Sequence, residues 1–221
     1  MHLIKTESVV KRRNAQFQLG PVNLVVRSGE VLGVIGKHDA GKTTLIRLIW
    51  GFLQPDQGMV SVFQRQPHLH QVSIRRRTGY LPESPCFEIQ KTARHHLEFV
   101  SHFYEGWDKA NVEALLDQFQ IDPDARIQEL SMSCRIKLAL ISAAGHNPYL
   151  LLLDNPMMQL ETQAWNEVSH FLRTLASKRG TGVVVSAQHS SDLLGLCDSI
   201  ITLVDGKPRE RQSENRAKAG L

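Results

Sequence analysis

Nine consecutive residues decide the fold: Gly36, Lys37, His38, Asp39, Ala40, Gly41, Lys42, Thr43 and Thr44 (GKHDAGKTT). The first eight match the pattern G-x-x-x-x-G-K-[ST], a phosphate-binding loop whose glycines let the backbone wrap closely around phosphate oxygens. An apolar run, VLGVI (31–35), precedes the loop, and the segment TTLIRLIWG (43–51), which has an apolar helical face, follows it. The sequence therefore predicts a strand, a loop and a helix in that order, as this motif requires.

This loop predicts a binding site for a nucleoside triphosphate. Backbone amides and the positive end of the following helix favour anions, Lys42 can reach the β- and γ-phosphates, and Thr43 can ligate Mg²⁺. A carboxylate that steadies the magnesium ion usually stands at the end of a buried strand. Asp154 follows the apolar run YLLLL (149–153), which suits a central parallel strand covered on both faces. By itself this aspartate would be interpreted as the cap of a turn, but together with the loop it is assigned to the site.

Hydrophobic periodicity and turn signals predict the other elements. Strands are expected near the amino terminus and over 19–26, 59–63, 182–186 and 199–204, and helices over 92–104, 108–119, 131–144 and 161–178. Asp108 and Ser131 are expected as helix N-caps, and Asp205 with Gly206 as a hairpin turn. The segment 207–221 is polar, lacks periodicity and is expected to be mobile.

Composition limits the class of protein. Of the 221 residues, 42% are hydrophobic and 22% are charged, as in an ordinary globular protein of one domain, with or without an insertion. The 26 Lys and Arg exceed the 22 Asp and Glu by a formal charge of +4, and the short basic runs 12–13 and 75–77 are interpreted as solvated surface. No specific nucleic acid is therefore expected as a partner. Since no stretch approaches the roughly 20 apolar residues of a membrane span and the amino terminus lacks a secretory signal pattern, we expect a cytosolic protein.

Cysteine and histidine spacing favours neither a disulfide framework nor a zinc site. Cys86, Cys134 and Cys197 are far apart and follow no C-x-x-C spacing, and the ten histidines are scattered.

The motifs follow one another in the order found in the ATP-binding subunits of ATP-binding cassette (ABC) transporters, and the chain resembles that family over nearly its whole length. In the family a loop bearing Gln or Glu, a helical subdomain, an LSGGQ-like signature, a D-loop and a switch His accompany the phosphate loop. Here GYLPES (79–84) places Glu83 in the first of these loops, LSMSC (130–134) places Ser131 in the signature, and VVVSAQHS (183–190) gives His189. The GYLPE loop and the segment FYEGWD (103–108) look most like the exporter-like (ABC-2 type) subfamily.

The resemblance implies an α/β fold of the P-loop NTPase type: a RecA-like parallel sheet flanked by helices, an amino-terminal antiparallel β part and a helical subdomain. Residues 1–221 would form a single ABC ATPase domain. Within it, residues 1–83 and 131–207 would make the core with its β subdomain, 84–130 the helical insertion, and 208–221 a mobile tail.

The family also implies ligands and roles. ATP and Mg²⁺ would be bound, with Thr43, Asp154 and Glu83 near the metal and His189 near the γ-phosphate. Arg13 stands where the family has an aromatic ring that stacks on adenine. Two cassettes would dimerise head to tail, as a homodimer or with a second ABC ATPase subunit, so that Ser131 of one faces the nucleotide of the other. The partner would be a transmembrane permease subunit, and the chain would lie in the cytoplasm, peripheral on the cytoplasmic face of the inner or plasma membrane.

Departures from the family pattern concern catalysis. The Glu that normally follows the aspartate, the general base of hydrolysis, is replaced by Asn155, and an amide accepts no proton at neutral pH. General base catalysis contributes about 10²- to 10⁴-fold, so hydrolysis should be slow by a comparable factor if no other group substitutes. Met132 and Ser133 stand where the signature has glycines, and side chains there crowd the approach to phosphate. The chain is therefore expected to be an ATPase whose hydrolysis is weakened by Asn155.

Three functions are compared. The first is the transporter subunit, binding MgATP at a dimer interface and coupling binding and slow hydrolysis to movement of a separate permease. The second is a nucleotide-gated regulatory subunit that is deficient in hydrolysis. The third is a soluble, non-transport ABC ATPase of DNA repair or translation, which would be expected to carry a long coiled-coil insertion or two cassettes in tandem. The sequence contains neither, which favours the first two.

Overall fold

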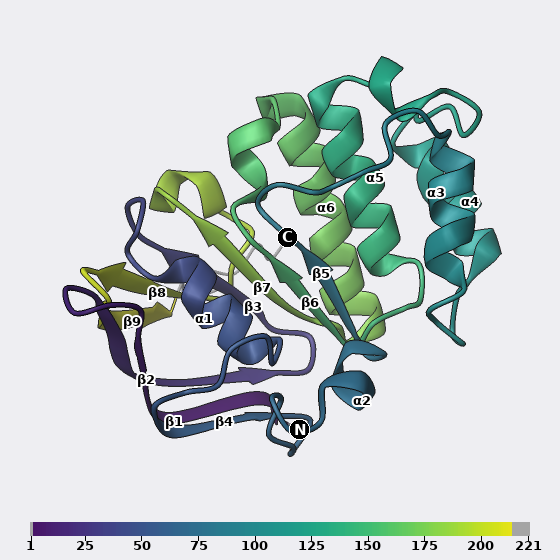
Figure 1. The fold of residues 1–221 in the computed structure, drawn as a ribbon. Helices are drawn as coiled ribbons and strands as arrows, with labels where there is room; N and C mark the ends of the chain where they lie inside the picture. The colour runs from purple at the N-terminus through teal and green to yellow at the C-terminus, as the bar shows by residue number, and fades with distance from the viewer. Residues whose placement is uncertain (1, 214–221) are drawn as a thin grey trace.

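A six-stranded sheet in the order β5-β6-β7-β3-β8-β9 forms the centre of the structure, a computed structural model that describes residues 2–213 (Figure 1). Five neighbouring strands of this sheet are parallel: β5 (Thr78–Leu81), β6 (Leu150–Leu153), β7 (Gly182–Ala187), β3 (Val31–Ile35) and β8 (Ser199–Val204). A second, antiparallel sheet has the order β2-β1-β4 and comprises β1 (His2–Arg12), β2 (Gln18–Arg27) and β4 (Gln57–Val62). The predicted combination of a parallel core sheet and an amino-terminal antiparallel part is confirmed.

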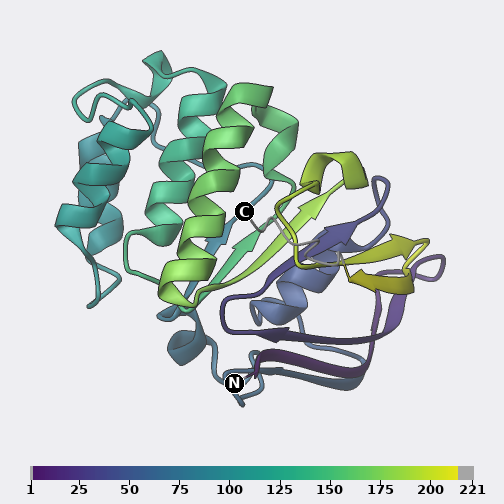
Figure 2. The same ribbon diagram turned by 180° about the vertical axis from the view of Figure 1, so that it is seen from behind.

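Helices cover both faces of the central sheet (Figures 1 and 2). Helices α5 (Met132–Ala144) and α6 (Thr162–Arg179) lie on one face, and α1 (Lys42–Ile49) lies on the other, between the two sheets. Beyond α5 lie α3 (Ala93–Ser101) and α4 (Lys109–Gln118), which form a helical block at one end of the molecule. The shorter elements are α2 (Gln71–Arg75) and the 3-10 turns η1 (Ile127–Glu129), η2 (Pro156–Gln159) and η3 (Ser190–Leu193).

The continuous apolar run of β6 is explained by the two cores that the sheet separates. Successive side chains of a strand point to opposite faces. Leu150 and Leu152 accordingly belong to the core that includes α1 and the antiparallel sheet, whereas Leu151 and Leu153 belong to the core that includes α5 and α6. All four are fully buried, so a polar side chain at any of these positions would lie in one core or the other. The apolar run ends with β6 at Leu153, and the next residue is the polar Asp154.

Both predicted N-caps are confirmed by hydrogen bonds. Asp108 Oδ1 accepts from the backbone N–H of Asn111 (3.0 Å) at the start of α4. Ser131 Oγ accepts from the N–H of Cys134 (3.1 Å) at the start of α5. Each cap satisfies an amide that has no partner within the first turn of its helix, and so fixes the residue at which that helix begins.

The carboxyl-terminal segment differs from the expectation. Lys207–Ser213 forms β9, an edge strand antiparallel to β8, so the prediction of a mobile tail is wrong for these residues. The predicted hairpin turn at Asp205 and Gly206 is present, and it returns the chain alongside β8, where the backbone ladder orders a polar segment without apolar alternation. Residues 214–221, the rest of the expected tail, lie outside the described part of the chain.

None of the helices found between residues 2 and 213 is both long enough and apolar enough to cross a lipid bilayer.

Candidate nucleotide-binding site

The phosphate-binding loop connects β3 to α1 and is shaped by its two glycines. Gly41 is the N-cap of α1 and has a left-handed φ of 102°, and a Cβ atom there would lie 3.1 Å from the Phe17 ring. A Cβ atom on Gly36 would lie 2.6 Å from the carbonyl oxygen of Leu203, closer than side chains approach backbone. Glycine is therefore required at both positions for the loop to close over the start of α1. The free amides of the first turn of α1 then face the loop, an arrangement that attracts anions.

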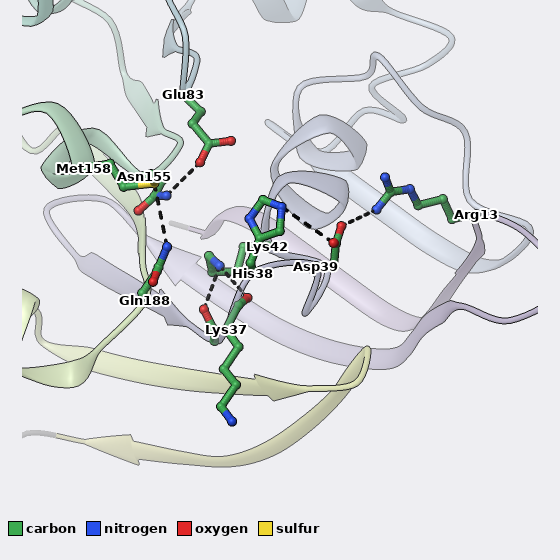
Figure 3. Close-up of polar contacts among 10 residues, drawn as sticks. Arg13, Lys37, His38, Asp39, Lys42, Glu83, Asn155, Met158 and Gln188 are labelled. Carbon is green, nitrogen blue, oxygen red and sulfur yellow. Dashed lines mark hydrogen bonds and ion pairs between the residues drawn. The ribbon is translucent and has the colours of Figure 1, made fainter.

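Lys42 brings a buried cation to the middle of the loop. Its side chain is largely buried, with 7% of the residue exposed, and Nζ donates to the carbonyl oxygens of Gly36 (2.7 Å) and Lys37 (2.9 Å), as Figure 3 shows. Burial lowers the pKa of Lys42, whereas the nearby carboxylates of Asp154 and Glu83 act to raise it. The ammonium group therefore stands between the loop backbone and the acidic side of the site.

Asp154 and Thr43 meet where β6 ends against the start of α1. Asp154 is 1% exposed, and its Oδ1 accepts from Thr43 Oγ1 (3.1 Å) and from Ser186 Oγ (2.9 Å). Burial raises the pKa of Asp154, and the two hydroxyl hydrogen bonds act against that shift. Hydroxyl and carboxylate oxygens are ligands that Mg²⁺ accepts, and it is commonly held by one or two protein groups together with substrate phosphates and water. The pair therefore fits the expected Mg²⁺, and within residues 2–213 no group of three or more His, Cys, Asp or Glu gathers to offer another site.

A cavity of about 440 Å³ opens beside the loop and collects most of the expected residues. Among those predicted from the sequence, its walls include Arg13, His38, Asp39, Gly41, Lys42, Thr43, Thr44, Glu83, Asp154 and Asn155. Lys11, Arg12, Arg47 and Leu53 also line it and were not expected. Five Lys and Arg side chains face three carboxylates in this wall, so the cavity combines a cationic lining with an acidic corner suited to a metal-bound polyanion.

The acidic corner contains an amide–carboxylate pair. Asn155 Nδ2 donates to Glu83 Oε1 at 2.8 Å (Figure 3). Gln159 Nε2 donates to the backbone carbonyl of Glu83, also at 2.8 Å. Asn155 is 4% exposed and has a left-handed backbone (φ 52°), which asparagine adopts more readily than most residues. Its N–H donates to Ser186 Oγ at 2.9 Å. Asn155 is thus fixed through its backbone by Ser186 and through its side chain by Glu83, and it holds Glu83 beside Asp154.

Ser186 was missed by sequence reasoning, although a signal for it exists. It is the one polar side chain in the otherwise apolar strand GVVVSA (182–187), and it is fully buried. A hydroxyl at such a position needs hydrogen-bond partners. Here it bridges Asp154 and Asn155, which ties the ends of β6 and β7 together.

Arg13 follows β1 and lies in the cavity wall with its guanidinium directed at the loop. Its Nη1 is 2.8 Å from Asp39 Oδ1, and this hydrogen bond lowers the pKa of Asp39 (Figure 3). His38 Nε2 lies 3.6 Å from the other oxygen of Asp39. Both partners of the Arg13–Asp39 pair are more than half exposed, so solvent screens the attraction. The pair closes one side of the cavity without burying a charge.

Gly36, Lys37 and Ala40 belong to the loop without lining the cavity, and two expected residues outside the loop lie away from it. Ser131 is exposed at the amino end of α5, beside Met132, of which 52% is exposed. His189 is exposed after β7, and its backbone N–H donates to Asp192 Oδ2 at 3.1 Å. Neither lines the cavity built by the described residues of one chain. Their surface positions leave both side chains open to a second molecule.

Known proteins resemble this chain in sequence and in fold. Residues 19–158, well over half of the chain, match the family described as ABC transporter. The bacitracin transport ATP-binding protein BcrA of Bacillus licheniformis is 27% identical over 207 residues, 93% of this chain and 68% of that protein. The Nod factor export ATP-binding protein I of Burkholderia orbicola is 27% identical over 210 residues, 92% of this chain and 68% of that protein. A solved structure of an ATP-binding subunit of an ABC transporter is 25% identical and superposes with a TM-score of 0.86 over 96% of this chain and 90% of that one. The chain belongs to the ABC transporter family, in which it is an ATP-binding subunit of the exporter-like kind.

Proposed function

We propose that this subunit binds MgATP between two cassettes and couples binding and slow hydrolysis to the movement of a separate membrane permease. The observation that carries the proposal is the convergence of Lys42, Thr43 and Asp154 at one end of β3 and β6, with Thr43 Oγ1 3.1 Å from Asp154 Oδ1. A catalytic apparatus for phosphoryl transfer consists largely of groups that position the phosphates and the metal. These three side chains are such groups.

Each residue around the loop has a distinct task in this proposal. Lys42 exchanges its bonds to the loop carbonyls for phosphate oxygens, and the amides of Gly41 to Thr44 donate to the same anion. Thr43 and Asp154 hold the metal, which when bound neutralises charge on the phosphate oxygens. Arg13 offers a flat guanidinium at the cavity wall for the adenine ring, once it leaves Asp39.

A second cassette completes the site. Ser131 and His189 are exposed outside the cavity of their own chain, and the family expectation assigns both to contacts with ATP held between two chains. The amino end of α5 adds its helix dipole to the Ser131 hydroxyl, which suits a phosphate on the facing subunit. Either a second copy of this chain or a different ABC ATPase subunit meets this need.

The permease is proposed to dock beside the helical block. A groove of about 230 Å³ runs between the segment after β5 and helices α3 and α5, and its walls include Tyr80, Pro85, Cys86, Phe87, His96 and Tyr104. Glu83 lies between this groove and the nucleotide cavity, and its segment is tied to η2 by the bonds from Asn155 and Gln159. A shift of this segment would therefore change both the groove and the nucleotide cavity. Such docking places the subunit on the cytoplasmic face of the membrane.

Co-expression with candidate permeases tests the proposal. A tagged full chain is produced with the membrane protein encoded beside it, and detergent extracts are purified through the tag with and without MgATP. We expect the two proteins to co-purify in a fixed ratio, and phosphate release to depend on the permease. A chain that binds MgATP but remains outside the membrane fraction with every candidate permease would contradict a transport role.

Asn155 favours a second candidate function, a nucleotide-gated regulatory subunit without useful hydrolysis. In that case MgATP would drive assembly and its turnover would be undetectable even in the complex with the permease. The same purified complex distinguishes the two candidates, because phosphate release above the rate of a Lys42→Ala complex supports the transporter subunit.

A further inference from the structure

The site retains a carboxylate although Asn155 stands at the position of the usual general base. Glu83 Oε1 accepts the 2.8 Å hydrogen bond from Asn155 Nδ2 and therefore lies directly beside the position from which a base would act. Glu83 lines the same cavity as Lys42, Thr43 and Asp154, and it is close enough to Lys42 and Asp154 for their charges to interact. The acidic corner thus contains a carboxylate on the segment after β5, next to the amide on the segment after β6.

The Asn155 amide is arranged to orient that carboxylate. Asn155 has its backbone N–H on Ser186 Oγ and is 4% exposed, so its side chain has little freedom. By donating through Nδ2 to one oxygen of Glu83, it leaves the other oxygen, Oε2, available. Gln159 fixes the backbone of Glu83 through its carbonyl oxygen. Two hydrogen bonds therefore hold Glu83, and a third fixes the backbone of Asn155, which donates one of them.

We propose that Glu83 is the general base of this cassette and that Asn155 is its positioning residue, an inference that rests on the proposed MgATP-binding function. Water gives a proton to the Glu83 carboxylate while the water oxygen forms its bond to the γ-phosphorus. The bond from that phosphorus to the bridging oxygen breaks, its electron pair leaves on ADP, and the proton passes from Glu83 to solvent. The products are ADP, inorganic phosphate and one proton.

Two other roles of Glu83 make different predictions. A ligand of Mg²⁺ would be needed for tight binding of MgATP, and a residue that only braces the segment after β5 would be needed whatever stands at position 155. For a general base, one carboxylate in the Glu83–Asn155 pair is sufficient, and a carboxylate at position 155 can replace the one at position 83. Rescue by exchange is therefore the signature of the proposed role.

The kinetic test compares four full-length chains: wild type, Glu83→Gln, Asn155→Glu, and the double variant with both changes. Phosphate release from MgATP is followed under single-turnover conditions, and MgATP affinity is measured by titration calorimetry. We expect Glu83→Gln to bind MgATP as the wild type does but to release phosphate about 10²- to 10⁴-fold more slowly. We expect the double variant, which restores a carboxylate beside an amide, to recover at least the wild-type rate.

A second measurement uses the nucleotide-free protein. Asn155→Glu places a second carboxylate against Glu83, and like charges at this distance disfavour the folded state. We expect Asn155→Glu to have a lower Tm at neutral pH than Asn155→Gln, the matched control with the same side-chain length and the same strained backbone. In the Glu83→Gln background this gap should close, because the pair again consists of one carboxylate and one amide.

These outcomes separate the inference from the function on which it rests. Equal phosphate release by wild type and Glu83→Gln, a parallel loss of MgATP affinity, or a double variant that does not recover would each overturn the role of Glu83. Additive Tm changes would show that residues 83 and 155 do not meet in solution, and would overturn it as well. Absence of MgATP binding by the wild type would instead contradict the proposed function.

Discussion

Asp154 and His146 are both buried ionisable side chains, and burial moves their pKa values in opposite directions. For Asp154, burial raises the pKa because it disfavours the anion, although Thr43 and Ser186 donate to that anion. For His146, burial lowers the pKa to about 4 because it disfavours the cation. His146 stacks on Tyr104 at 3.9 Å between ring centroids, and neither ring nitrogen has a hydrogen-bond partner within residues 2–213. Each group therefore makes stability depend on pH, with opposite sign.

The Asp154→Asn variant should be more stable than the wild type when nucleotide is absent. Because the pKa of Asp154 is raised on folding, the folded state holds its proton to higher pH than the unfolded state, and stability falls as pH rises through that window. At neutral pH the wild type is destabilised by the buried Asp154 anion. Asparagine keeps an acceptor oxygen for Thr43 and Ser186 and has no charge. We expect a higher Tm at pH 7 and a loss of the difference between MgATP and metal-free ATP binding. A lower Tm for Asp154→Asn would show that the surroundings stabilise the Asp154 carboxylate and would contradict this prediction.

The His146→Phe variant should resist acid better than the wild type. The folded protein keeps His146 neutral to about pH 4, whereas the unfolded chain takes up the proton near pH 6.5, so the contribution of this residue to stability is lost as pH falls from 6.5 towards 4. Phenylalanine keeps the stacking surface on Tyr104 and does not titrate. Urea midpoints at pH 7.5 and pH 5 should therefore differ less in His146→Phe than in the wild type. His95→Gln, a change at an exposed histidine, serves as the control and should follow the wild type.

The helical block depends on its packing against α5 and α6. Phe119, just after α4, is 1% exposed and meets the ring of Phe171 on α6 edge to face, with ring centroids 5.6 Å apart. Val112, Leu115 and Leu116 turn the buried face of α4 to the same core. The block is thus joined to the central sheet through a continuous apolar core, with Phe119 at its centre.

Removal of the Phe119 ring should lower the free energy of unfolding by a large amount. Phe119→Ala leaves a cavity that the aromatic partner does not fill, and such changes cost about 3–5 kcal/mol in other cores. We expect a loss of that size in chemical unfolding, together with weaker binding to any permease that docks beside the block. Phe119→Leu, which keeps most of the volume, should lose clearly less. Equal losses for the two variants would mean that volume is not what holds the block.

Sequence patterns predicted the elements that bury continuous apolar runs and missed those fixed by tertiary pairing. Strands β3, β6 and β8 follow from runs such as VLGVI (31–35), because a strand covered on both faces must be apolar throughout. Strand β9 has no such run and is ordered by the ladder with β8, which no local pattern encodes. At the site, the motif identified Thr43 and Asp154. The contact between Glu83 and Asn155, 72 positions apart, arises because β5 and β6 are neighbours in the sheet.

The whole fold brings four distant parts of the chain to one cavity: the end of β1, the stretch from the phosphate-binding loop through α1 to Leu53, the segment after β5 and the end of β6. Parallel strands make this possible, because their carboxyl ends meet at one edge of the sheet, where α/β proteins commonly bind ligands. The groove proposed for the permease lies between the segment after β5 and helices α3 and α5. The segment that carries Glu83 borders both, and in the proposed function it would connect the nucleotide with the permease.

Binding of MgATP to the full chain tests the central claim most directly. Titration calorimetry should show one saturable site per chain in the wild type. Lys42→Ala should weaken binding about 10- to 100-fold, because hydrogen bonds to a charged group contribute about 1.5–3 kcal/mol. Lys178→Ala, the same chemical change at an exposed lysine near the end of α6, should bind as the wild type does. Equal affinity of wild type and Lys42→Ala for MgATP would contradict the account.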